Sequence, residues 1–397
     1  MKGPIVYVAG VSWDAVPGTD RNLVERLGRC APVIWVDPPQ SLLAARRADA
    51  VRRLVSFSEV GEGVRRLQVL GPPAMTRFGV RTVAWAWLFS RLRHALRGGA
   101  VPVALVLANP ECVFPRGVAG RRLYYVTDDW VAGASLMGLS ARRIARLQRR
   151  NARDADVVMT VSQHLSSHLQ RRLSLGNAVV LPNGCDPALF ADVAAARSRP
   201  GAASPPPLAG FVGQLNERID VSMLEAVAGT GLEMLLVGPR TGREASWARR
   251  LDDLIARPNV TWVGQQPLTQ LPAFLGRMTV GMTPYADTEF NRASFPLKTL
   301  EYLSAGLPVV SSATPSAQWL ETDLVEVAPT AEEFARCVAR QARSEPQEDD
   351  VIARVRFAEG HSWRSRAEDL AKLASGGVDG CLTESAEAAR RSPLERQ

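Results

Sequence analysis

The chain alternates short β-branched runs with segments of helical periodicity, and it does so twice, on either side of a proline-rich interruption. This alternation is typical of parallel sheets, because parallel neighbours must be joined by a crossover, which is usually a helix. Residues 197–207 (RSRPGAASPPP) carry no apolar periodicity and are predicted to be a linker. The sequence therefore predicts the α/β class, with two Rossmann-like open parallel-sheet domains facing a cleft.

The predicted elements divide at this linker. Strands of the first half are Ile5–Ala9, Val33–Asp37, Leu67–Leu70, Val103–Ala108, Leu123–Val126, Val157–Val161 and Val179–Leu181, with helices such as Asp20–Arg29 and Ala141–Ala155 between them. Strands of the second half are Leu208–Val212, Met234–Val237, Val260–Val263, Val280–Thr283, Pro308–Ser311 and Val325–Ala328. Its helices are Val221–Ala228, Glu244–Ile255, Leu268–Gly276, Leu297–Ser304 and Ala331–Arg343. We expect domains at 1–195 and 208–360, a closing segment at 361–375 and a mobile polar tail at 376–397.

Charge is unevenly distributed along the 397 residues, whose net charge is +8. Residues 1–190 hold 26 Lys and Arg against 13 Asp and Glu, and residues 191–397 hold the remaining 22 and 27. The first part is therefore +13 and the second −5. This asymmetry indicates an anionic partner for the first part, either nucleic acid or an anionic membrane surface. A solvated arginine-rich surface is the alternative.

The cysteines and the N-terminus indicate the compartment. The five cysteines are dispersed, without a CxxC pair or a nearby His at metal-ligand spacing, as in reduced cytoplasmic proteins. The first ten residues (MKGPIVYVAG) lead straight into a strand-like run, without the apolar region and cleavage site of a signal peptide. No window approaches the roughly 18 consecutive apolar residues of a membrane span. We therefore expect a cytoplasmic protein.

One segment of the first half could contact a membrane directly. Residues 78–96 (FGVRTVAWAWLFSRLRHAL) combine an apolar surface with positive charge. The apolar side chains are Val83, Trp85, Trp87, Leu88, Phe89 and Leu92, and the charged ones are Arg81, Arg91, Arg93, His94 and Arg97. A basic, tryptophan-bearing amphipathic helix can lie on an anionic bilayer. The alternative is an internal helix of the first domain.

The stretch 294–310 (SFPLKTLEYLSAGLPVV) carries the strongest chemical signal. Pro296 suits the first position of a helix and Gly306 its end. This helix would follow a strand, in the region where open α/β sheets bind their ligands. Lys298 and Glu301 are three residues apart and share a helix face. Lys298 in the first turn suits a phosphate, and Glu301 can accept hydrogen bonds from a ribose diol. A surface Lys–Glu pair is the alternative.

The run FPLKTLEYLSAGLPVV resembles the nucleotide-binding motif of retaining family 4 glycosyltransferases of the GT-B fold. It is most similar to a branch that makes bacterial surface polysaccharides and teichuronic-type polymers. Further segments resemble the family in the same order: Ala155–Ser162, Leu181–Asp186, Phe211–Leu215, Asn259–Gly264 and His361–Trp363. The resemblance covers residues 150–375 well and 1–150 more loosely. It implies an acceptor-side first domain, a nucleotide-sugar-binding second domain and a closing helix at 361–375 that crosses back to the first.

The resemblance also implies roles for individual residues. Glu301 would bind the ribose and Lys298 the diphosphate. Gly213 would let the backbone approach the phosphates, and Arg218 would stabilise the leaving diphosphate. The complete nucleotide-binding set is Gly213, Arg218, Gly238, Gly264, Pro296, Leu297, Lys298 and Glu301. A surface arginine is the alternative for Arg218, and ordinary turn glycines are the alternative for Gly238 and Gly264.

Two positions depart from the family. A second Glu often lies eight residues before the ribose-binding one, but Ala293 stands there, and the nearest upstream acid is Glu289. Gly213 is followed by Gln214 where the family often has Arg, so that Arg218 is the basic residue of this loop. These departures bear on the donor-sugar contacts and the retaining outcome more than on nucleotide binding.

Two acids of the first half complete the candidate catalytic set with Arg218 and Lys298. Asp128 and Asp129 follow a predicted strand, and one of them would orient or deprotonate an acceptor hydroxyl. Capping of a helix before Trp130 is the alternative. The loop Gly10–Gly18 would line the acceptor side, and it lacks the GxGxxG pattern of a dinucleotide site.

The sequence thus predicts a hexosyl-type glycosyltransferase (EC 2.4 class) that is metal-independent and retaining. Its donor substrate would be a UDP- or GDP-linked sugar, with no cofactor, and its acceptor a glycan or lipid-linked hydroxyl. We expect it in the cytoplasm or peripheral on the inner face of the cell membrane, with an anionic membrane surface as a candidate partner and no nucleic acid. The alternatives are a degenerate, non-catalytic GT-B subunit, suggested by Ala293 and Gln214, and a basic nucleic-acid-binding protein.

Overall fold

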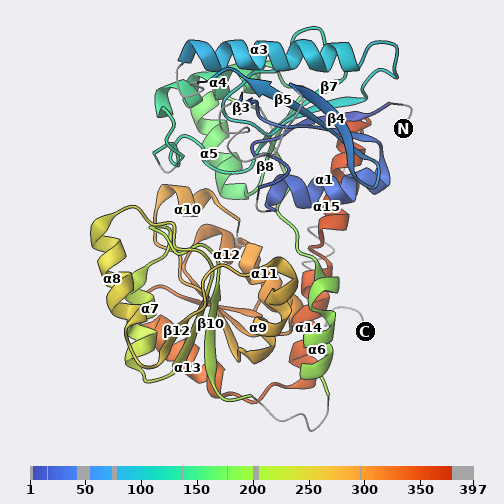
Figure 1. Ribbon diagram of the computed structural model, residues 1–397. Coiled ribbons are helices and arrows are strands. Elements are labelled where there is room, and N and C mark those ends of the chain that lie inside the picture. Colours follow the sequence, from blue (N-terminus) through green and yellow to red (C-terminus); the bar gives the residue numbers. More distant parts are fainter. Residues whose placement is uncertain are drawn as a thin grey trace. The chain divides into compact units, whose positions relative to one another are not determined.

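The structure is a computed structural model and forms two compact α/β units (Figure 1). It describes residues 3–15, 17–42, 54–73, 78–135, 137–176, 178–199, 205–295 and 297–377. Of the described residues, the first unit comprises those up to Pro182 and those from Trp363 to Gly377, and the second comprises those within Asn183–Ser362. Each unit has its own parallel sheet, so the predicted α/β class with two Rossmann-like domains is confirmed.

The sheet of the first unit runs in the order β3-β5-β2-β1-β6-β7-β8-β9, and these strands are parallel. Their bounds are β1 Ile5–Val8, β2 Val33–Val36, β3 Gln40–Ser41, β5 Val64–Gly71, β6 Ala104–Leu107, β7 Arg121–Val126, β8 Val157–Thr160 and β9 Val179–Val180. The strand β4 (Val55–Gly61), which the sequence did not predict, pairs antiparallel with β5. None of its residues (VSFSEVG) is fully buried, so it lacks the strong apolar run of the other strands. Gly63, with φ of +66°, lies in the turn between the two strands.

Helices of the first unit include α1 (Thr19–Cys30), α3 (Phe78–Ala95), α4 (Ala141–Asp154) and α5 (Gln163–Leu173). The late helix α15 (Trp363–Ala374) packs against α1, and Arg121 donates a hydrogen bond to the carbonyl oxygen of Leu373 at 2.9 Å. The helix α15 thus belongs to the first unit although the residues before it belong to the second. Among the described helices, none is both long and apolar enough to cross a membrane.

The first domain was expected to extend to residue 195, but the division lies at Pro182 and Asn183. The short helices η1 (Pro187–Phe190) and α6 (Ala191–Arg197) belong to the second unit. The physical reason is a hydrogen-bonded anchor: Arg197 donates to the carbonyl oxygens of Leu275 and Met278, at 2.7 and 2.6 Å.

The second sheet is parallel throughout its described strands and has the order β12-β11-β10-β13-β14-β15. The strands are β10 Leu208–Val212, β11 Glu233–Val237, β12 Val260–Trp262, β13 Val280–Thr283, β14 Val309–Ser312 and β15 Val325–Ala328. Counted from β10, this is the order 3-2-1-4-5-6 of dinucleotide-binding folds. The chain order reverses between β10 and β13, and the crevice outside their carboxyl ends is where such sheets bind ligands.

Helices cover both faces of the second sheet (Figure 1). On one face α7 (Val221–Gly229), α8 (Ala245–Ile255) and α13 (Ala331–Arg343) bury apolar side chains such as Leu224, Leu254 and Phe334 against the strands. On the other lie α9 (Leu271–Arg277), α11 (Leu297–Ser304) and α14 (Glu348–Glu359), the last of which was not predicted. The short helices α10 (Glu289–Ala293) and α12 (Pro315–Trp319) pack against each other.

One contact fixes α11 on the sheet. The ring of Tyr302 is buried and lies so close to Gly281 that a Cβ there would be 2.5 Å from it. Its hydroxyl oxygen accepts a hydrogen bond from the backbone N–H of Val212 at 2.7 Å. Because Gly281 belongs to β13 and Val212 to β10, this single side chain ties the helix to both strands at the reversal of chain order.

We expect Gly281→Ala to destabilise the second unit by roughly 1–3 kcal/mol, because the methyl group would overpack the buried ring of Tyr302. Urea unfolding followed by circular dichroism measures this. Gly276→Ala is the matched control, since nothing lies within 4 Å of a Cβ at that helical glycine. It should be neutral or stabilising by up to about 1 kcal/mol. Equal stability of the two variants would show that the Tyr302 contact is not tight.

Candidate active site

The candidate site lies at the carboxyl ends of β10 and β13. The loop after β10 contains Gly213 and Arg218, and the segment after β13 contains Tyr285 and the helices α10 and α11. These two connections leave the sheet at the point where its chain order reverses. Residues that are more than 70 positions apart in sequence are thereby brought together.

Lys298 and Glu301 lie on one face of α11, as their spacing predicts. The Nζ of Lys298 is 2.6 Å from Oε2 of Glu301, and both side chains are largely enclosed, at 22% and 13% exposure. Lysine has three N–H donors, so two remain for a ligand after this contact. The second carboxylate oxygen of Glu301 has no hydrogen-bond partner within the described chain. The pair can therefore present a donor and an acceptor side by side.

Arg218 is held by the segment after β13. Its Nε donates to the side-chain oxygen of Asn291 at 3.0 Å, and its Nη2 donates to the hydroxyl of Ser294 at 3.2 Å. The guanidinium also lies 4.8 Å from the ring centre of Phe290. Asn291 is buried and returns a hydrogen bond to the carbonyl oxygen of Arg218 at 2.8 Å. These contacts fix the orientation of Arg218 and use only part of its five donors.

The charges of this site act on one phenol. Burial raises the pKa of Tyr285, the positive charges of Arg218 and Lys298 oppose that rise, and Glu301 adds to it. The ring centre of Tyr285 is also 5.7 Å from the guanidinium carbon of Arg218. Arg218, Lys298 and Glu301 are therefore all near enough to Tyr285 to act on its phenol. A bound diphosphate there would meet two cations, and a diol beside it would meet one carboxylate.

Three predicted glycines lie side by side beyond the ends of β10, β11 and β12. The N–H of Gly213 donates to Val237 O at 2.9 Å, and the N–H of Gly238 donates to Gly264 O at 2.8 Å. A Cβ on Gly238 would be 1.8 Å from the carbonyl oxygen of Gly213, so close packing alone requires glycine at 238. Gly264 has φ of +71° with open space around it. At this row of three glycines, the glycine row, no side chain covers the backbone at the carboxyl ends of the strands.

The structure adds residues that sequence reasoning missed. Asn291 and Ser294 hold Arg218, and their only sequence signal is their position just before the Lys298 motif. Trp262 donates through Nε1 to Gly238 O at 2.9 Å, and Arg240 stacks on its ring at 5.4 Å. This aromatic–cation pair therefore borders the glycine row.

The other predicted positions near α11 lie at the start of this helix and in α10. Leu297 is the first residue of α11 and is partly buried, and Pro296 lies outside the described residues. Ala293 is buried, with 2% exposure, at the end of α10. Glu289 starts that helix and is exposed. A methyl group therefore stands at the position where the resembling family often has a second carboxylate.

The two acids after β7 differ in their surroundings. Asp129 is buried, and its Oδ1 accepts hydrogen bonds from the N–H groups of Val131 and Ala132, both at 3.1 Å. Its Oδ2 lies 3.8 Å from Nε2 of His168. Asp129 thus caps the turn after β7, in keeping with the capping alternative. Asp128 is partly buried and helps to raise the pKa of Tyr125, for which burial is the larger cause.

Buried acids also organise the loop after β1 in the first unit. Asp20 accepts hydrogen bonds from the Tyr7 hydroxyl at 2.7 Å and from the Gly10 N–H at 2.9 Å. Asp37 is fully buried and accepts from the backbone N–H of Trp13 at 2.9 Å. Arg66 donates to Asp37 at 2.6 Å and also pairs with Asp14. These contacts hold the described part of the loop that was predicted to line the acceptor side, and residue 16 of that loop lies outside the description.

Comparison with known proteins identifies the second unit. Residues 206–343 match the family model described as glycosyl transferases group 1. The chain is a glycosyltransferase with the GT-B fold, and its second unit resembles the group 1 family. It is 27% identical over 323 residues to TuaH of Bacillus subtilis (strain 168), assigned to teichuronic acid biosynthesis as a glycosyltransferase, covering 74% of this chain and 75% of that one. The resemblance noted from the sequence is therefore confirmed.

Solved glycosyltransferases share the fold over nearly the whole length of this one. Sucrose-phosphate synthase from Thermosynechococcus elongatus has a TM-score of 0.70 at 18% identity, with 94% of this chain and 98% of that chain covered. HepE of Anabaena, in complex with UDP and glucose, has a TM-score of 0.67 at 13% identity, with 94% and 99% covered. WaaG, involved in lipopolysaccharide biosynthesis, has a TM-score of 0.65 at 16% identity, with 94% and 100% covered.

Asp20 should make the stability of the glycosyltransferase depend on pH. Burial raises its pKa from 3.8 to about 6, so the fold favours the protonated acid. As pH rises from about 4 to above 6, the unfolded chain loses this proton first, and the free energy of unfolding should fall by up to about 3 kcal/mol. Urea unfolding of wild type and Asp20→Asn at pH 4.5 and 7.5 measures the fall, which the variant should lack. Asp253→Asn, an exposed change on α8, should behave as wild type. The same pH dependence in Asp20→Asn would contradict the assignment.

Proposed function

We propose that this glycosyltransferase moves a hexosyl group from a UDP- or GDP-linked sugar to a hydroxyl of a glycan or lipid-linked acceptor, in the synthesis of a cell-surface polysaccharide or glycolipid. The observation that carries the proposal is the convergence of Lys298, Glu301 and Arg218 at the carboxyl ends of β10 and β13. Two cations and one carboxylate at this position match the charges and hydrogen-bonding groups of a nucleoside diphosphate.

Each group has a distinct part in donor binding. Lys298 would contact the diphosphate as a point charge, and Glu301 would accept hydrogen bonds from the two ribose hydroxyls. The glycine row would allow the nucleotide to approach the backbone without meeting a Cβ. The two remaining N–H donors of Lys298 and the second carboxylate oxygen of Glu301 would serve the donor while their mutual contact stays in place.

In the transfer, the bond between the anomeric carbon and the diphosphate oxygen breaks and a bond to the acceptor oxygen forms. The electron pair leaves with the diphosphate, where negative charge develops, and Arg218 is clamped in place to stabilise it. The acceptor hydroxyl gives up its proton, either to the leaving phosphate oxygen or to a carboxylate. Asp128 and Asp129 are the candidate carboxylates, and Oδ1 of Asp129 also caps the turn after β7.

Two finer features of the reaction belong to the same proposal. We infer that transfer needs no metal ion, because Lys298 and Arg218 supply the positive charge that a diphosphate requires. We also infer retention of the anomeric configuration from the family resemblance, although Ala293 replaces the second carboxylate often found there. A product analysis by NMR separates retention from inversion.

The relatives favour particular substrates. HepE binds UDP and glucose in its solved complex, which supports UDP over GDP as the nucleotide. The role assigned to TuaH in teichuronic acid biosynthesis supports an acceptor that belongs to a surface polymer.

We also propose a cytoplasmic location at the inner face of the cell membrane. Among the described cysteines, Cys30, Cys112, Cys185 and Cys337, no disulfide is formed, as in a reducing compartment. Trp85, Leu88, Phe89 and Leu92 of α3 are buried, so this helix is largely an internal part of the first domain. It still exposes Val83 and Trp87, at 62% and 39%, as a bilayer contact would require.

Glu301→Ala should weaken the binding of UDP or GDP about tenfold to a hundredfold, because the ribose loses charge-assisted hydrogen bonds. Isothermal titration calorimetry measures this, and inorganic diphosphate serves as a second ligand. Its affinity should change little, since the carboxylate does not contact it. Glu225→Ala is the control, because Glu225 forms a comparable pair with Arg250 on α7 and α8, at 2.6 Å. Unchanged nucleotide affinity in Glu301→Ala would reject the ribose assignment.

Arg218→Lys should lower kcat about a hundredfold to a thousandfold, with a smaller change in the donor KM, because the clamped guanidinium acts mainly on developing charge. Steady-state assays with the best donor from a nucleotide-sugar panel test this. Arg277→Lys, an exposed change at the end of α9, should leave kcat unaltered. A wild-type protein that binds nucleotide but forms no product from any donor would favour the degenerate, non-catalytic alternative.

A further inference from the structure

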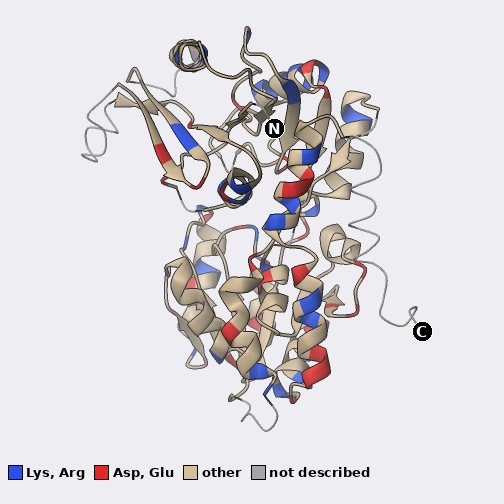
Figure 2. Ribbon diagram, turned by 90° about the vertical axis from the view of Figure 1, so that its right-hand side faces the viewer, with Lys and Arg blue, Asp and Glu red and all other residues tan. Residues whose placement is uncertain are grey.

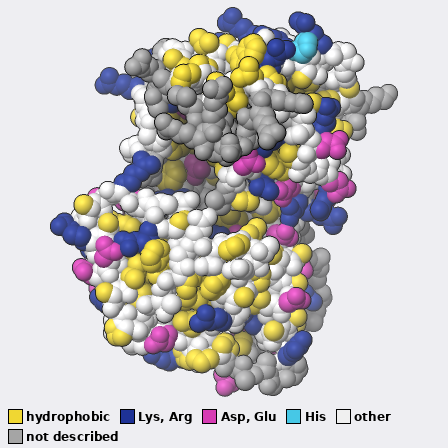
Figure 3. All heavy atoms as spheres, viewed as in Figure 1, with side chains coloured by type: hydrophobic (Ala, Val, Ile, Leu, Met, Phe, Trp, Pro, Cys, Tyr) yellow, Lys and Arg dark blue, Asp and Glu magenta, His cyan; other side chains and the backbone are white. Residues whose placement is uncertain are grey.

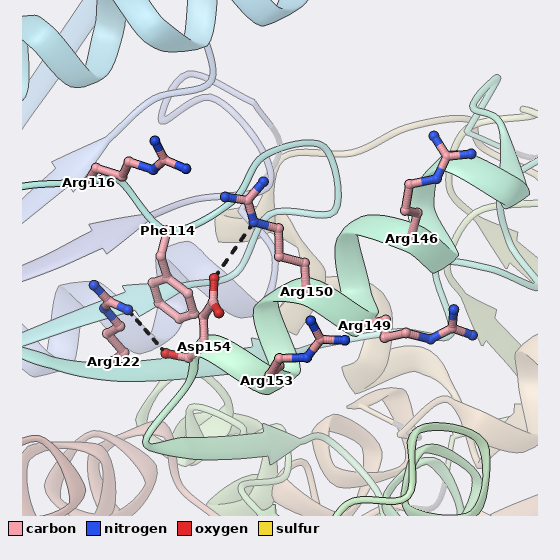
Figure 4. A pocket seen from close by; sticks show the side chains of 8 residues that line it. All are labelled: Phe114, Arg116, Arg122, Arg146, Arg149, Arg150, Arg153 and Asp154. Carbon is pink, nitrogen blue, oxygen red and sulfur yellow. Dashed lines mark hydrogen bonds and ion pairs between the residues drawn. The ribbon is translucent and has the colours of Figure 1, made fainter.

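A second concentration of charge lies in the first unit, remote in sequence from the residues of the donor site. It is a pocket of about 540 Å³ between α4, the start of β7 and the loop before it (Figure 4). Six arginines line it: Arg146, Arg149, Arg150 and Arg153 along α4, with Arg116 and Arg122 on the opposite side. Phe114 is buried in the wall, and Arg122 stacks on its ring at 5.9 Å. The pocket therefore lies at the amino end of β7, away from the carboxyl end that Asp128 and Asp129 follow.

The pocket has very little negative charge. Its one carboxylate is Asp154, which lies 3.7 Å from Arg150. Within the described chain, no acidic partner contacts Arg116, Arg146, Arg149 or Arg153. Some arginines elsewhere are paired with acids, for example Arg240 with Asp252 and Arg292 with Asp287. Arginines three and four residues apart on α4 repel one another, so the helix bears a cost that an anionic ligand would remove.

The backbone beneath these arginines is well anchored. Asn151 of α4 is buried and donates to Cys112 O at 2.9 Å, which ties the helix to the loop carrying Phe114 and Arg116. Arg93 of α3 donates to Arg116 O at 3.0 Å. The charges therefore stand on a fixed frame rather than on a loose segment.

The basic surface continues along α4. A neighbouring pocket of about 420 Å³ shares Arg146 and is also lined by Arg81, Arg142 and Arg143. Its one acid, Glu111, is already paired with Arg81. Burial, and then the charge of Arg143, lower the pKa of Arg81. The two pockets therefore adjoin at Arg146 of α4. The basic positions of the chain can be followed in Figure 2.

The exposed side of α3 indicates which anion would fit. This helix presents Val83 and Trp87, and Arg91 stacks on Trp87 at 5.1 Å. Hydrophobic side chains gather on the surface over α3, with Arg and His beside them (Figure 3). A bilayer accepts apolar side chains next to its phosphates, whereas a soluble anion or a duplex leaves them in water.

We propose that the arginine pocket binds lipid headgroups that carry two phosphates, and thereby docks the first unit on an anionic membrane. A volume of this size accommodates a whole small ligand rather than one phosphate. Guanidinium groups bind phosphate oxygens in bidentate fashion, so opposed pairs of arginines can hold two phosphates at once. The inference rests on the proposed membrane location but not on glycosyl transfer.

Vesicle co-sedimentation of the full-length protein tests this. Phosphatidylcholine vesicles would contain either cardiolipin or phosphatidylglycerol at equal total charge. Wild type should bind the cardiolipin vesicles about tenfold more tightly, which corresponds to one additional charge-assisted contact. The double variant Arg149→Ala/Arg153→Ala should lose this preference and bind about thirtyfold more weakly, because each basic residue contributes separately at an anionic surface.

A charge-matched control is Arg249→Ala/Arg277→Ala, two exposed arginines of the second unit. It should keep the wild-type affinity and preference. All four side chains are exposed. Thermal unfolding should therefore be unchanged in the control and unchanged or slightly raised in the pocket variant, in which repulsion along α4 is relieved. An equal loss of vesicle affinity in the control would show that binding depends on net charge and would reject the pocket as the lipid site.

The remaining outcomes separate this inference from the proposed function. Vesicle affinity could be the same for both lipids and for wild type and the pocket variant. That result would reject the pocket as the lipid site but would still support the membrane location. No binding to any vesicle would reject both, while nucleotide binding measured by calorimetry would still support glycosyl transfer. Inorganic diphosphate could bind while nucleotide saturates the donor site, with no binding to vesicles. That result would indicate a site for a free anion and contradict the proposal that the ligand is a lipid. Tighter, steeply salt-dependent binding to duplex DNA would instead support a nucleic-acid partner.

Discussion

The arrangement of the candidate donor site depends on how Tyr302 is buried. Its ring rests on Gly281 of β13 while its hydroxyl accepts the N–H of Val212 of β10, so α11 is fixed over the reversal of chain order. In a helix each residue is rotated by a constant angle from the last, and fixing one side chain therefore fixes the directions of its neighbours. Glu301 precedes Tyr302 and Lys298 lies one turn earlier. The directions of the Lys298 and Glu301 side chains are therefore set by the packing of α11 on the sheet and not by the helix alone.

The two units use positive charge in different ways. In the second unit each cation of the candidate site has defined partners: Lys298 meets Glu301, and Arg218 meets Asn291 and Ser294. Cations held in fixed orientations in this way suit the binding of a single nucleotide and the stabilisation of negative charge that develops on a leaving group. In the first unit, several arginines of α4 stand beside one another with one nearby acid. That excess suits a ligand with several charges, and it explains why the net positive charge is concentrated in the first half of the chain.

Much of the fold follows from local pattern. The strands Leu208–Val212 and Val280–Thr283 and the helices Leu297–Ser304 and Ala331–Arg343 have the bounds predicted from apolar periodicity and turn residues. The misses share a cause. The polar strand β4 is stabilised by pairing with β5, and α6 joins the second unit because Arg197 reaches carbonyl groups around α9 and β13. Contacts of this kind join residues far apart in sequence, and no short window contains them.

The sequence by itself determined that Lys298 and Glu301 share a helix face, because their separation matches the turn of a helix wherever that helix lies. It also marked Gly213, Gly238 and Gly264 as strand-end glycines. Only the tertiary structure decided that Asn291 and Ser294 hold Arg218, that Asp129 is a cap, and that arginines from two segments of the first unit face one pocket. Helical and strand periods act over a few residues, whereas these arrangements depend on the order of strands in a sheet and on the side chains packed against it.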